Sequence, residues 1–436
     1  KKGENKMKLK NSLMFLSSLM LFVIVGCSTD DDDNNGDGGG TTLIDTPTSY
    51  SFASRFNEGE SSVSYSGQVV RNLLINDIKT QMGTDAGTMN PATLVSMMAN
   101  DDADRAILSS ASMSTDQTKY HDISTSHLND RLEAVSDIII PGYDANAGTL
   151  VSGWLQECAA AGKTRANGVR LDQITQKTLW GAVSYWQGTS KYMSKIPNDD
   201  NSVADGDGAA YTAMEHHWDE SFGYFGAALD YNTAYTDDTR KNGPNVDSDG
   251  SNSIDFKSEY NVGWAITAAK RDLCSSCDED LDFTKTIFDA YLEGRTLIAN
   301  QADLAEILVQ RDIILNTWEK VVAAVSIHYV NDVADEIAAL IAAADTSITA
   351  GSAATADYEN VWGEMRGYAN GLLYNTFALI EPDNLERILT VMGTAPVYPS
   401  NGNFDYMQAY HTSLVGEVRQ IFKASYGFTD ANVAGW

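Results

Sequence analysis

Residues 303–335 read DLAEILVQRDIILNTWEKVVAAVSIHYVNDVAD. Apolar side chains recur in this stretch at intervals of three and four positions, as they do along one face of an α-helix. The positions that follow this spacing are Leu304, Ile307, Leu308, Leu315, Trp318, Val321, Val322 and Val325. The spacing predicts one long helix over the whole stretch.

The same spacing extends over much of the chain. It recurs in three further long segments, residues 171–186, 358–373 and 407–421. Shorter helices are predicted over residues 66–81, 91–99, 127–138, 211–229, 259–271, 283–300 and 384–392. The alternating pattern of a β-strand is limited to hints at residues 138–140 and 396–398. The sequence therefore predicts an all-α protein, a multi-helix bundle.

The length of the chain bears on its domain organisation. About 390 residues follow the N-terminal segment, which is more than one hydrophobic core usually serves. We expect two packed helical lobes, residues 46–232 and 258–436, separated by a loop rich in Asp, Asn and Gly at residues 233–257. The segments that begin at Gly181 and Gly371 resemble each other weakly, and small residues there would let helices approach closely.

The N-terminal segment has the pattern of a signal peptide. We assign it to residues 1–26, with residues 1–6 upstream of the start at Met7. Lysines follow Met7, and the apolar run Leu13–Val25 is shorter than the ~20 residues that span a membrane. After Cys27, residues up to 45 are rich in Asp, Asn and Gly, which predicts a disordered acidic tether.

Val25-Gly26-Cys27 resembles the lipobox of bacterial lipoproteins, which implies that Cys27 carries the lipid. The alternative is an ordinary secretory signal in which Cys27 is incidental. The acidic run 30–33 resembles the surface-export signal of Bacteroidetes lipoproteins. This resemblance implies a lipid anchor in the outer membrane of a Gram-negative bacterium, on the cell surface. Attachment that faces the periplasm is the alternative.

The formal net charge of -30 argues against nucleic acid and anionic membrane surfaces as partners. Besides Cys27, the chain holds Cys158, Cys274 and Cys277. An envelope location permits disulfides, and three thiols allow one bridge. Cys274 and Cys277 are either a bridge that stabilises a loop or a redox pair, and no βαβ pattern surrounds them to favour the second.

Residues 247–259 match much of the pattern of a calcium-binding EF-hand loop. Such a loop supplies oxygens from positions one, three, five, seven and nine, and a bidentate Glu from position twelve. The corresponding residues are Asp247, Asp249, Ser251, the carbonyl of Ser253 and Asp255, with Glu259 one position late. Asn252 stands at the turn where Gly is usual, and Asn tolerates the left-handed backbone. A simple solvated acidic loop is the alternative.

A second candidate site lies in the helix predicted around Glu215-His216-His217-Trp218-Asp219-Glu220. On a helical wheel, Glu215 and Asp219 share one flank, and His217 and Glu220 share another. A His and a carboxylate three positions apart can ligate a transition metal such as iron or zinc, provided that further ligands join them. The alternative is a hydrogen bond between His217 and Glu220 at a helix boundary.

Several features together resemble an uncharacterised family of bacterial envelope lipoproteins associated with the imelysin-like proteins. The features are Tyr50-Ser51-Phe52, residues 176–187 and 214–225, and the acidic loop that runs into Ser258-Glu259-Tyr260. Imelysin-like proteins are all-α with the signature Gly-x-His-x-x-Glu. His217 and Glu220 match its second half, whereas Glu215 replaces the Gly. The resemblance implies either peptidase activity or a role in iron or haem acquisition.

These observations lead to three hypotheses. The leading one is a non-enzymatic surface lipoprotein that binds a metal ion or haem at His217 and Glu220 and supports iron or metal acquisition. An outer-membrane transporter is then a possible partner, and calcium in the loop 247–259 would brace the structure. The second hypothesis is an imelysin-like metallopeptidase. The third is a structural lipoprotein that docks on a partner and has no metal chemistry.

Overall fold

The computed structural model describes residues 43–84, 87, 89–243, 245–272, 274, 276–277 and 281–436. The predicted signal peptide, the lipidated Cys27 and the tether as far as Thr42 lie outside the described residues. Leu43–Trp436 form one compact unit, to which both predicted lobes, 46–232 and 258–436, contribute helices. A search of the described residues finds no helix with the length and apolar character needed to cross a membrane.

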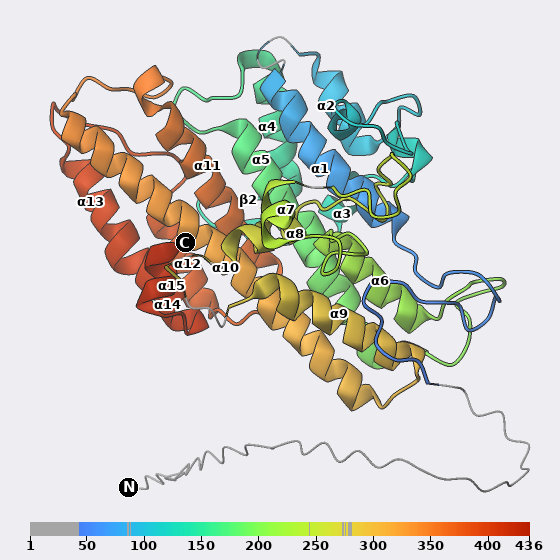
Figure 1. Cartoon of the computed structure of the whole chain (residues 1–436). Helices are drawn as coiled ribbons and strands as arrows, with labels where there is room; N and C mark the ends of the chain where they lie inside the picture. Colours follow the sequence, from blue (N-terminus) through green and yellow to red (C-terminus); the bar gives the residue numbers. More distant parts are fainter. Residues whose placement is uncertain are drawn as a thin grey trace, which may run out of the picture. The chain divides into compact units, whose positions relative to one another are not determined.

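The described chain is built from α-helices, which confirms the predicted fold class (Figure 1). Its only strands among the described residues are β1 (Ile139–Ile140) and β2 (Ala145–Asn146). They pair antiparallel, with Ile139 opposite Asn146. The other extended hint, at residues 396–398, contains no strand.

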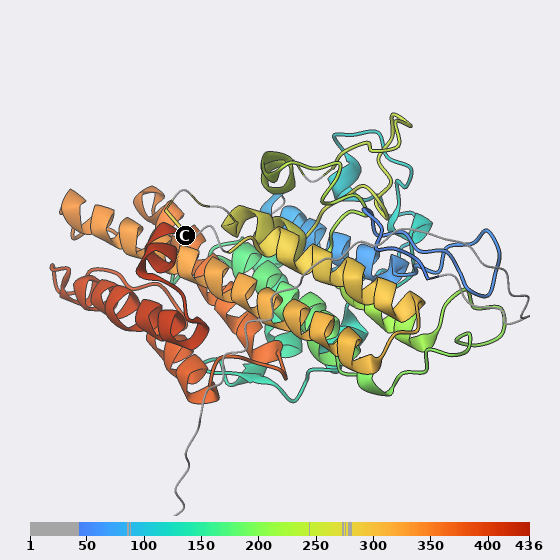
Figure 2. The same ribbon diagram turned by 60° about the horizontal axis from the view of Figure 1, so that its bottom comes forward.

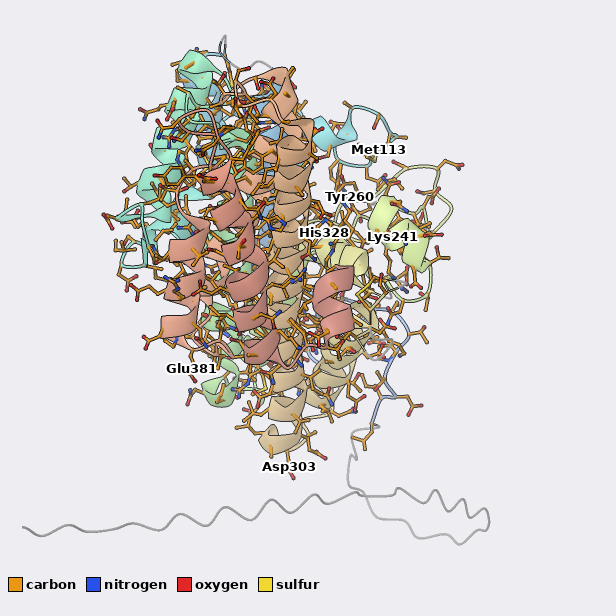
Figure 3. The ribbon with its side chains drawn as sticks, turned by 90° about the vertical axis from the view of Figure 1, so that its left-hand side faces the viewer. Met113, Lys241, Tyr260, Asp303, His328 and Glu381 are labelled. Carbon is orange, nitrogen blue, oxygen red and sulfur yellow. A yellow bond between two sulfur atoms is a disulfide. The ribbon has the colours of Figure 1, made fainter. Side chains whose placement is uncertain are left out.

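The long helix predicted from residue 303 is α10 (Leu304–Ala343), which runs through the unit from Asp303 past His328 (Figure 3). It continues beyond the predicted end at Asp335 because Ile337 and Leu340 extend its buried face. It packs against α9 (Phe283–Ala299) on one side and α11 (Ala356–Gly371) on another (Figure 2). Three C-terminal helices also pack against α10, namely α13 (Asp405–Ser413), α14 (Arg419–Tyr426) and α15 (Asp430–Gly435). The helix α12 (Pro382–Met392) packs against α11.

The N-terminal half of the unit supplies the remaining helices. They are α1 (Ser66–Thr84), α2 (Pro91–Ala99), α3 (Asn129–Glu133), α4 (Ala147–Ala161), α5 (Leu171–Leu179), α6 (Ala213–Phe225), α7 (Asp237–Asn242) and α8 (Trp264–Arg271), of which the last two precede α9. Helix α4 is not among the helices predicted above. Its signals are the Asn146 side chain, which accepts the N–H of Thr149 as a helix cap, and the buried face made by Val151, Trp154 and Leu155.

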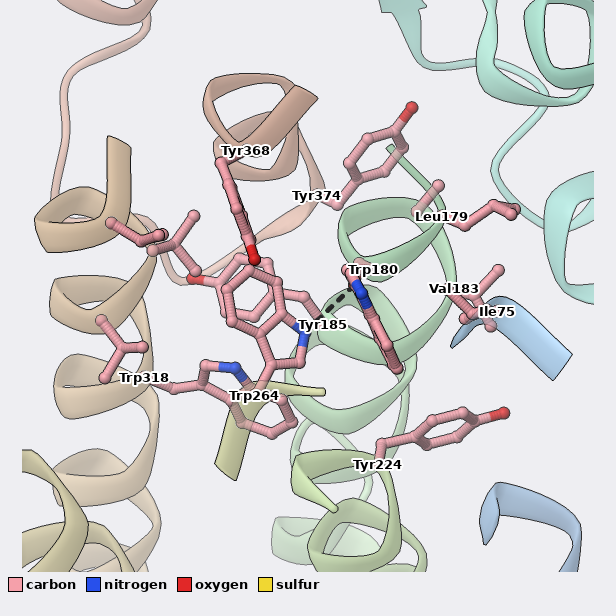
Figure 4. Close-up of a cluster of buried hydrophobic side chains, with 14 of the residues drawn as sticks. Ile75, Leu179, Trp180, Val183, Tyr185, Tyr224, Trp264, Trp318, Tyr368 and Tyr374 are labelled. Carbon is pink, nitrogen blue, oxygen red and sulfur yellow. Dashed lines mark hydrogen bonds between the residues drawn. The ribbon is translucent and has the colours of Figure 1, made fainter. Parts of the chain in front are cut away.

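Two glycines, Gly181 and Gly371, allow a close contact between helices. A Cβ on Gly181 would lie 2.5 Å from the Cα of Gly371, so no larger residue fits between these backbones. Gly181 belongs to a π-helical segment, Trp180–Tyr185, which continues α5. Around this contact lies an aromatic core in which the indole N–H of Trp264 donates to the carbonyl of Trp180 at 3.1 Å (Figure 4).

Candidate functional site

The loop 247–259 brings three carboxylates together. Oxygens of Asp247, Asp249 and Glu259 all lie within 4.8 Å of one another. Among the described residues, this is the group of three or more His, Cys, Asp or Glu side chains whose spacing suits a metal ion. No Lys, Arg or His of the described chain forms an ion pair with any of the three. Their negative charge therefore lacks a basic side-chain partner within the described part of the chain.

The backbone of the loop folds around the carboxylates. Asp247 accepts the N–H groups of Gly250 at 2.7 Å and Asn252 at 2.8 Å. Asn252 has the left-handed conformation expected of it, with φ of 67°. The carboxylate of Asp249 accepts the N–H of Ser251, and this bond lowers the pKa of Asp249. These contacts aim both carboxylates into the loop.

Glu259 closes the loop although it comes one position late. Its carboxylate is buried, and it accepts the N–H groups of Ser248 at 2.7 Å, Asp249 at 3.2 Å and Asp255 at 3.0 Å. Three backbone donors fix the orientation of an ionised carboxylate. Glu259 is thus the most firmly held of the three acidic groups.

The other predicted calcium ligands differ in placement. The hydroxyl of Ser251 donates to the carbonyl of Ser253 at 3.0 Å, so these two oxygens are neighbours at the tip of the loop. The structure does not bring Asp255 into the acidic group. Its carboxylate accepts the side-chain N–H of Gln117 at 2.9 Å and the hydroxyl of Ser258 at 2.9 Å. Asp255 anchors the loop and is not placed to serve as its ninth-position ligand.

The loop is attached to the helical unit at several points. Ile254 pairs with Thr115 in an isolated parallel bridge, and the hydroxyl of Tyr235 donates to the carbonyl of Glu259 at 2.5 Å. Asn245 pairs with Tyr260 and also contacts the sulfur of Met113 at 3.5 Å. Met113 and Tyr260 are labelled on this side of the unit in Figure 3.

The candidate pair on α6 takes a different form. Nδ1 of His217 lies 2.7 Å from Oδ2 of Asp199, and Nε2 lies 2.8 Å from Nζ of Lys195. A lysine can only donate, so Nε2 accepts and Nδ1 donates to Asp199. Both ring nitrogens are therefore engaged. Glu220 accepts from the side-chain amide of Gln68 at 2.8 Å, and the structure does not join it to His217.

The other flank of α6 holds a buried ion network that sequence reasoning placed only in part. As predicted, Glu215 and Asp219 share a flank, and both bind Arg295 of α9 at 3.0 Å. All three side chains are fully buried. The hydroxyl of Tyr50 donates to Asp219 at 2.7 Å, which ties the N-terminal segment to α6. Burial, with Glu215 nearby, raises the pKa of Asp219 to about 6, although Arg295 opposes this shift.

Cys274 and Cys277 form a disulfide, with Cα atoms 5.1 Å apart. Cys158 is free and buried in α4. Burial raises the pKa of its thiol to about 11, so it stays protonated at neutral pH. A buried thiol of this kind acts as a small apolar side chain.

The fold and the loop define a class: an all-helical protein with a candidate site for a divalent cation in an acidic loop. The chain belongs to the family described as "Domain of unknown function (DUF4856)", whose model matches residues 47–355. No curated protein and no solved structure matches the chain. The match confirms the prediction of an uncharacterised family and includes the loop, whereas the association with imelysin-like proteins stays a prediction.

Proposed function

We propose that this protein is a non-enzymatic binding protein of the bacterial outer membrane, anchored by lipid at Cys27, which holds a calcium ion in the loop 247–259. One observation carries the cation site. The oxygens of Asp247, Asp249 and Glu259 lie within 4.8 Å of one another and have no basic partner in the described chain. Calcium prefers oxygen ligands of this kind and accepts irregular geometry.

The burial of the three carboxylates indicates what the cation would do. Glu259 is buried, Asp247 is half-buried and Asp249 is exposed, so an ion here would link the tip of the loop to its base. It would also relieve the repulsion among three charges held close together. The ion would brace a surface segment against the helical unit.

Calcium titration of the full chain after treatment with a chelator tests this proposal. We expect binding in the range of about 10⁻⁵ to 10⁻³ M, as extracellular calcium modules show. The double variant Asp247→Asn, Asp249→Asn should bind at least tenfold more weakly. Asp116→Asn is the matched control, because Asp116 is an exposed carboxylate beside Ile254 that lies outside the group. Equal affinity in the wild type and the double variant would sink the proposal.

Iron, zinc or haem handling through His217 and Glu220 is a weaker proposal, and so is a metallopeptidase activity. The contacts favour the loop as the cation site, because Asp199 and Lys195 engage both ring nitrogens of His217. Elemental analysis of the protein as isolated distinguishes the two sites. The loop proposal expects calcium, lost in the double aspartate variant, whereas a site on α6 expects a transition metal that His217→Ala removes.

A further inference from the structure

A cavity of about 230 Å³ lies where α1, α5, α8, α10 and α11 meet. Its lining is basic and aromatic. The basic residues are Lys79, Lys177, Lys270 and Arg271, the aromatic residues are Trp180, Tyr329 and Tyr368, and the carboxylate is Glu364. These residues come from segments far apart in the sequence, so only the packing of the helices brings them together.

The charges of the cavity are unbalanced. Nζ of Lys177 lies 3.0 Å from Oε1 of Glu364, which accounts for the one carboxylate in the lining. Lys79, Lys270 and Arg271 form no ion pair within the described part of the chain. Nε of Arg271 is buried and has no hydrogen-bond partner there. Three cations around one cavity therefore lack a carboxylate within ion-pair distance, in a chain whose net charge is -30.

Two acidic residues near the cavity lie outside its lining. Asp172 pairs with Arg170 at 2.7 Å. Asp332 lies 3.3 Å from Nε2 of His328, but burial lowers the pKa of this imidazole to about 4, so the charge of Asp332 acts on Arg271 from outside ion-pair distance. Burial, with the neighbouring Lys177, lowers the pKa of Lys79 to about 8, so the surroundings of Lys79 oppose its charged form. A bound anion would reverse this effect, because it stabilises the charged form of each lysine.

One wall of the cavity is aromatic. The rings of Tyr329 and Tyr368 stack with centroids 5.6 Å apart and an interplanar angle of 11°. Nζ of Lys177 lies 5.6 Å from the centroid of the Tyr368 ring. The indole ring of Trp180 packs against Gly263, where an added Cβ would lie 2.6 Å from the ring. The wall thus offers flat apolar surface directly beside the basic groups.

We propose that this cavity binds a small organic anion. Its carboxylate or phosphate group faces Lys79, Lys177 and Arg271, and its planar or apolar part packs against Trp180 and Tyr329. Exposed Lys270 lies at the rim, where it attracts the anion into the cavity. A volume of about 230 Å³ leaves room for roughly eight water-sized groups, so the ligand is small. The binding does not depend on a cation in the loop 247–259.

Isothermal titration of the full chain with three probes tests the chemistry of the ligand. The probes are benzoate, inorganic phosphate and benzamide, the last a neutral molecule of the same shape as benzoate. We expect benzoate to bind and benzamide to bind at least tenfold more weakly, because only benzoate carries the charge. Phosphate binding as tight as that of benzoate would assign the site to the anionic group alone and would overturn the role of the aromatic wall.

Three variants locate the binding. Lys79→Gln and Arg271→Gln should each weaken benzoate about tenfold, since a hydrogen bond to a charged group contributes that much. Arg271→Lys keeps the charge and should keep most of the affinity, which guards against a variant that simply misfolds. Lys257→Gln, at an exposed lysine outside the cavity, is the matched control and should bind as the wild type does. Absence of binding up to about 10 mM for benzoate and phosphate, or unchanged affinity in both Gln variants, would overturn the proposal.

Discussion

The loop 247–259 collects negative charges, and the cavity among α1, α5, α8, α10 and α11 collects positive charges. The two regions assemble these charges in different ways. The loop draws Asp247, Asp249 and Glu259 from one short stretch, and none of them has a basic partner in the described chain. The cavity draws four basic residues and one carboxylate from four helices, α1, α5, α8 and α11. The charge of the loop has the same sign as the net charge of the chain, whereas the charge of the cavity has the opposite sign.

This difference shows that net charge says little about a specific site. The loop needs few other elements for its geometry, because its carboxylates accept N–H groups from its own backbone. The cavity has no such local support. Lys177 and Glu364 meet only because α5 packs on α11. The positions of the charged groups in the cavity therefore depend on the packing of the buried aromatic core (Figure 4). Perturbing the core should therefore affect the cavity and spare the loop.

Among the variants considered, Gly181→Ala should have the largest effect on the cavity while it leaves the loop unchanged. Its Cβ would lie 2.5 Å from the Cα of Gly371, and backbone cannot move aside easily. We expect the free energy of unfolding to fall by about 3 kcal/mol. The helices that carry Lys177 and Glu364 would move apart, so benzoate affinity should fall while calcium affinity stays. Urea unfolding and the two titrations measure these changes.

Gly153→Ala in α4 is the control for that experiment. Nothing lies within 4 Å of the Cβ it would add, and a helical Ala is about 0.5–1 kcal/mol more favourable than Gly. We expect this variant to be slightly more stable than the wild type. If both glycine variants unfold at the same urea concentration, the close contact between Gly181 and Gly371 does not constrain the helices.

Glu259→Gln should have the opposite pattern of effects, because it perturbs the loop and leaves the cavity unchanged. The buried carboxylate accepts three backbone N–H groups, and an amide would direct a donor toward some of them. We expect a loss of about 2 kcal/mol in stability and of most calcium affinity. Benzoate affinity should not change. Glu58→Gln, at an exposed residue, is the control. Calcium affinity retained in Glu259→Gln would show that Glu259 is no ligand.

Glu364→Gln changes the balance of charge in the cavity. Lys177 would lose its ionised partner but would keep the side-chain oxygens of Gln173 at 2.9 Å and Gln176 at 2.7 Å. The loss of stability should therefore be modest, about 1–2 kcal/mol. With the one carboxylate of the lining neutralised, benzoate should bind more tightly and should raise the melting temperature more than in the wild type. Weaker binding in this variant would contradict the proposed role of the unpaired cations.

Features that arise from neighbouring residues in the sequence, such as a helix or a loop, can be predicted from the sequence. Features that the packing of distant segments brings together cannot. The apolar spacing of residues 303–335 is enough to predict α10, and the oxygens of the loop are recognisable because they are contiguous. The partners of His217 are not recognisable, since Asp199 and Lys195 precede it by about twenty residues in a segment without periodicity. The cavity leaves no local signal at all, because its residues come from five helices.

Asp249 in the loop and Asp272 beside the cavity both lack a basic partner, yet they should respond to pH in opposite directions. The N–H of Ser251 lowers the pKa of Asp249 in the loop, so the stability that Asp249 contributes is lost as the pH falls through its folded-state value. Burial raises the pKa of Asp272, which follows Arg271, to about 7, although it accepts the N–H of Thr284 at 3.0 Å. A raised pKa changes the stability with pH in the opposite direction. Its contribution is complete below the ordinary value of 3.8 and is lost as the pH rises through about 7.

We therefore expect Asp272→Asn to gain stability relative to the wild type between pH 4 and pH 8. The difference should be about 1 kcal/mol, because water partly screens a half-buried carboxylate. Asp249→Asn should lose stability relative to the wild type as the pH rises above about 4, when calcium is removed by a chelator. Urea unfolding of the three proteins at several pH values measures both effects. Parallel curves for the two variants would show that burial does not distinguish these carboxylates, and that acidic groups respond to the net charge of the chain rather than to their surroundings.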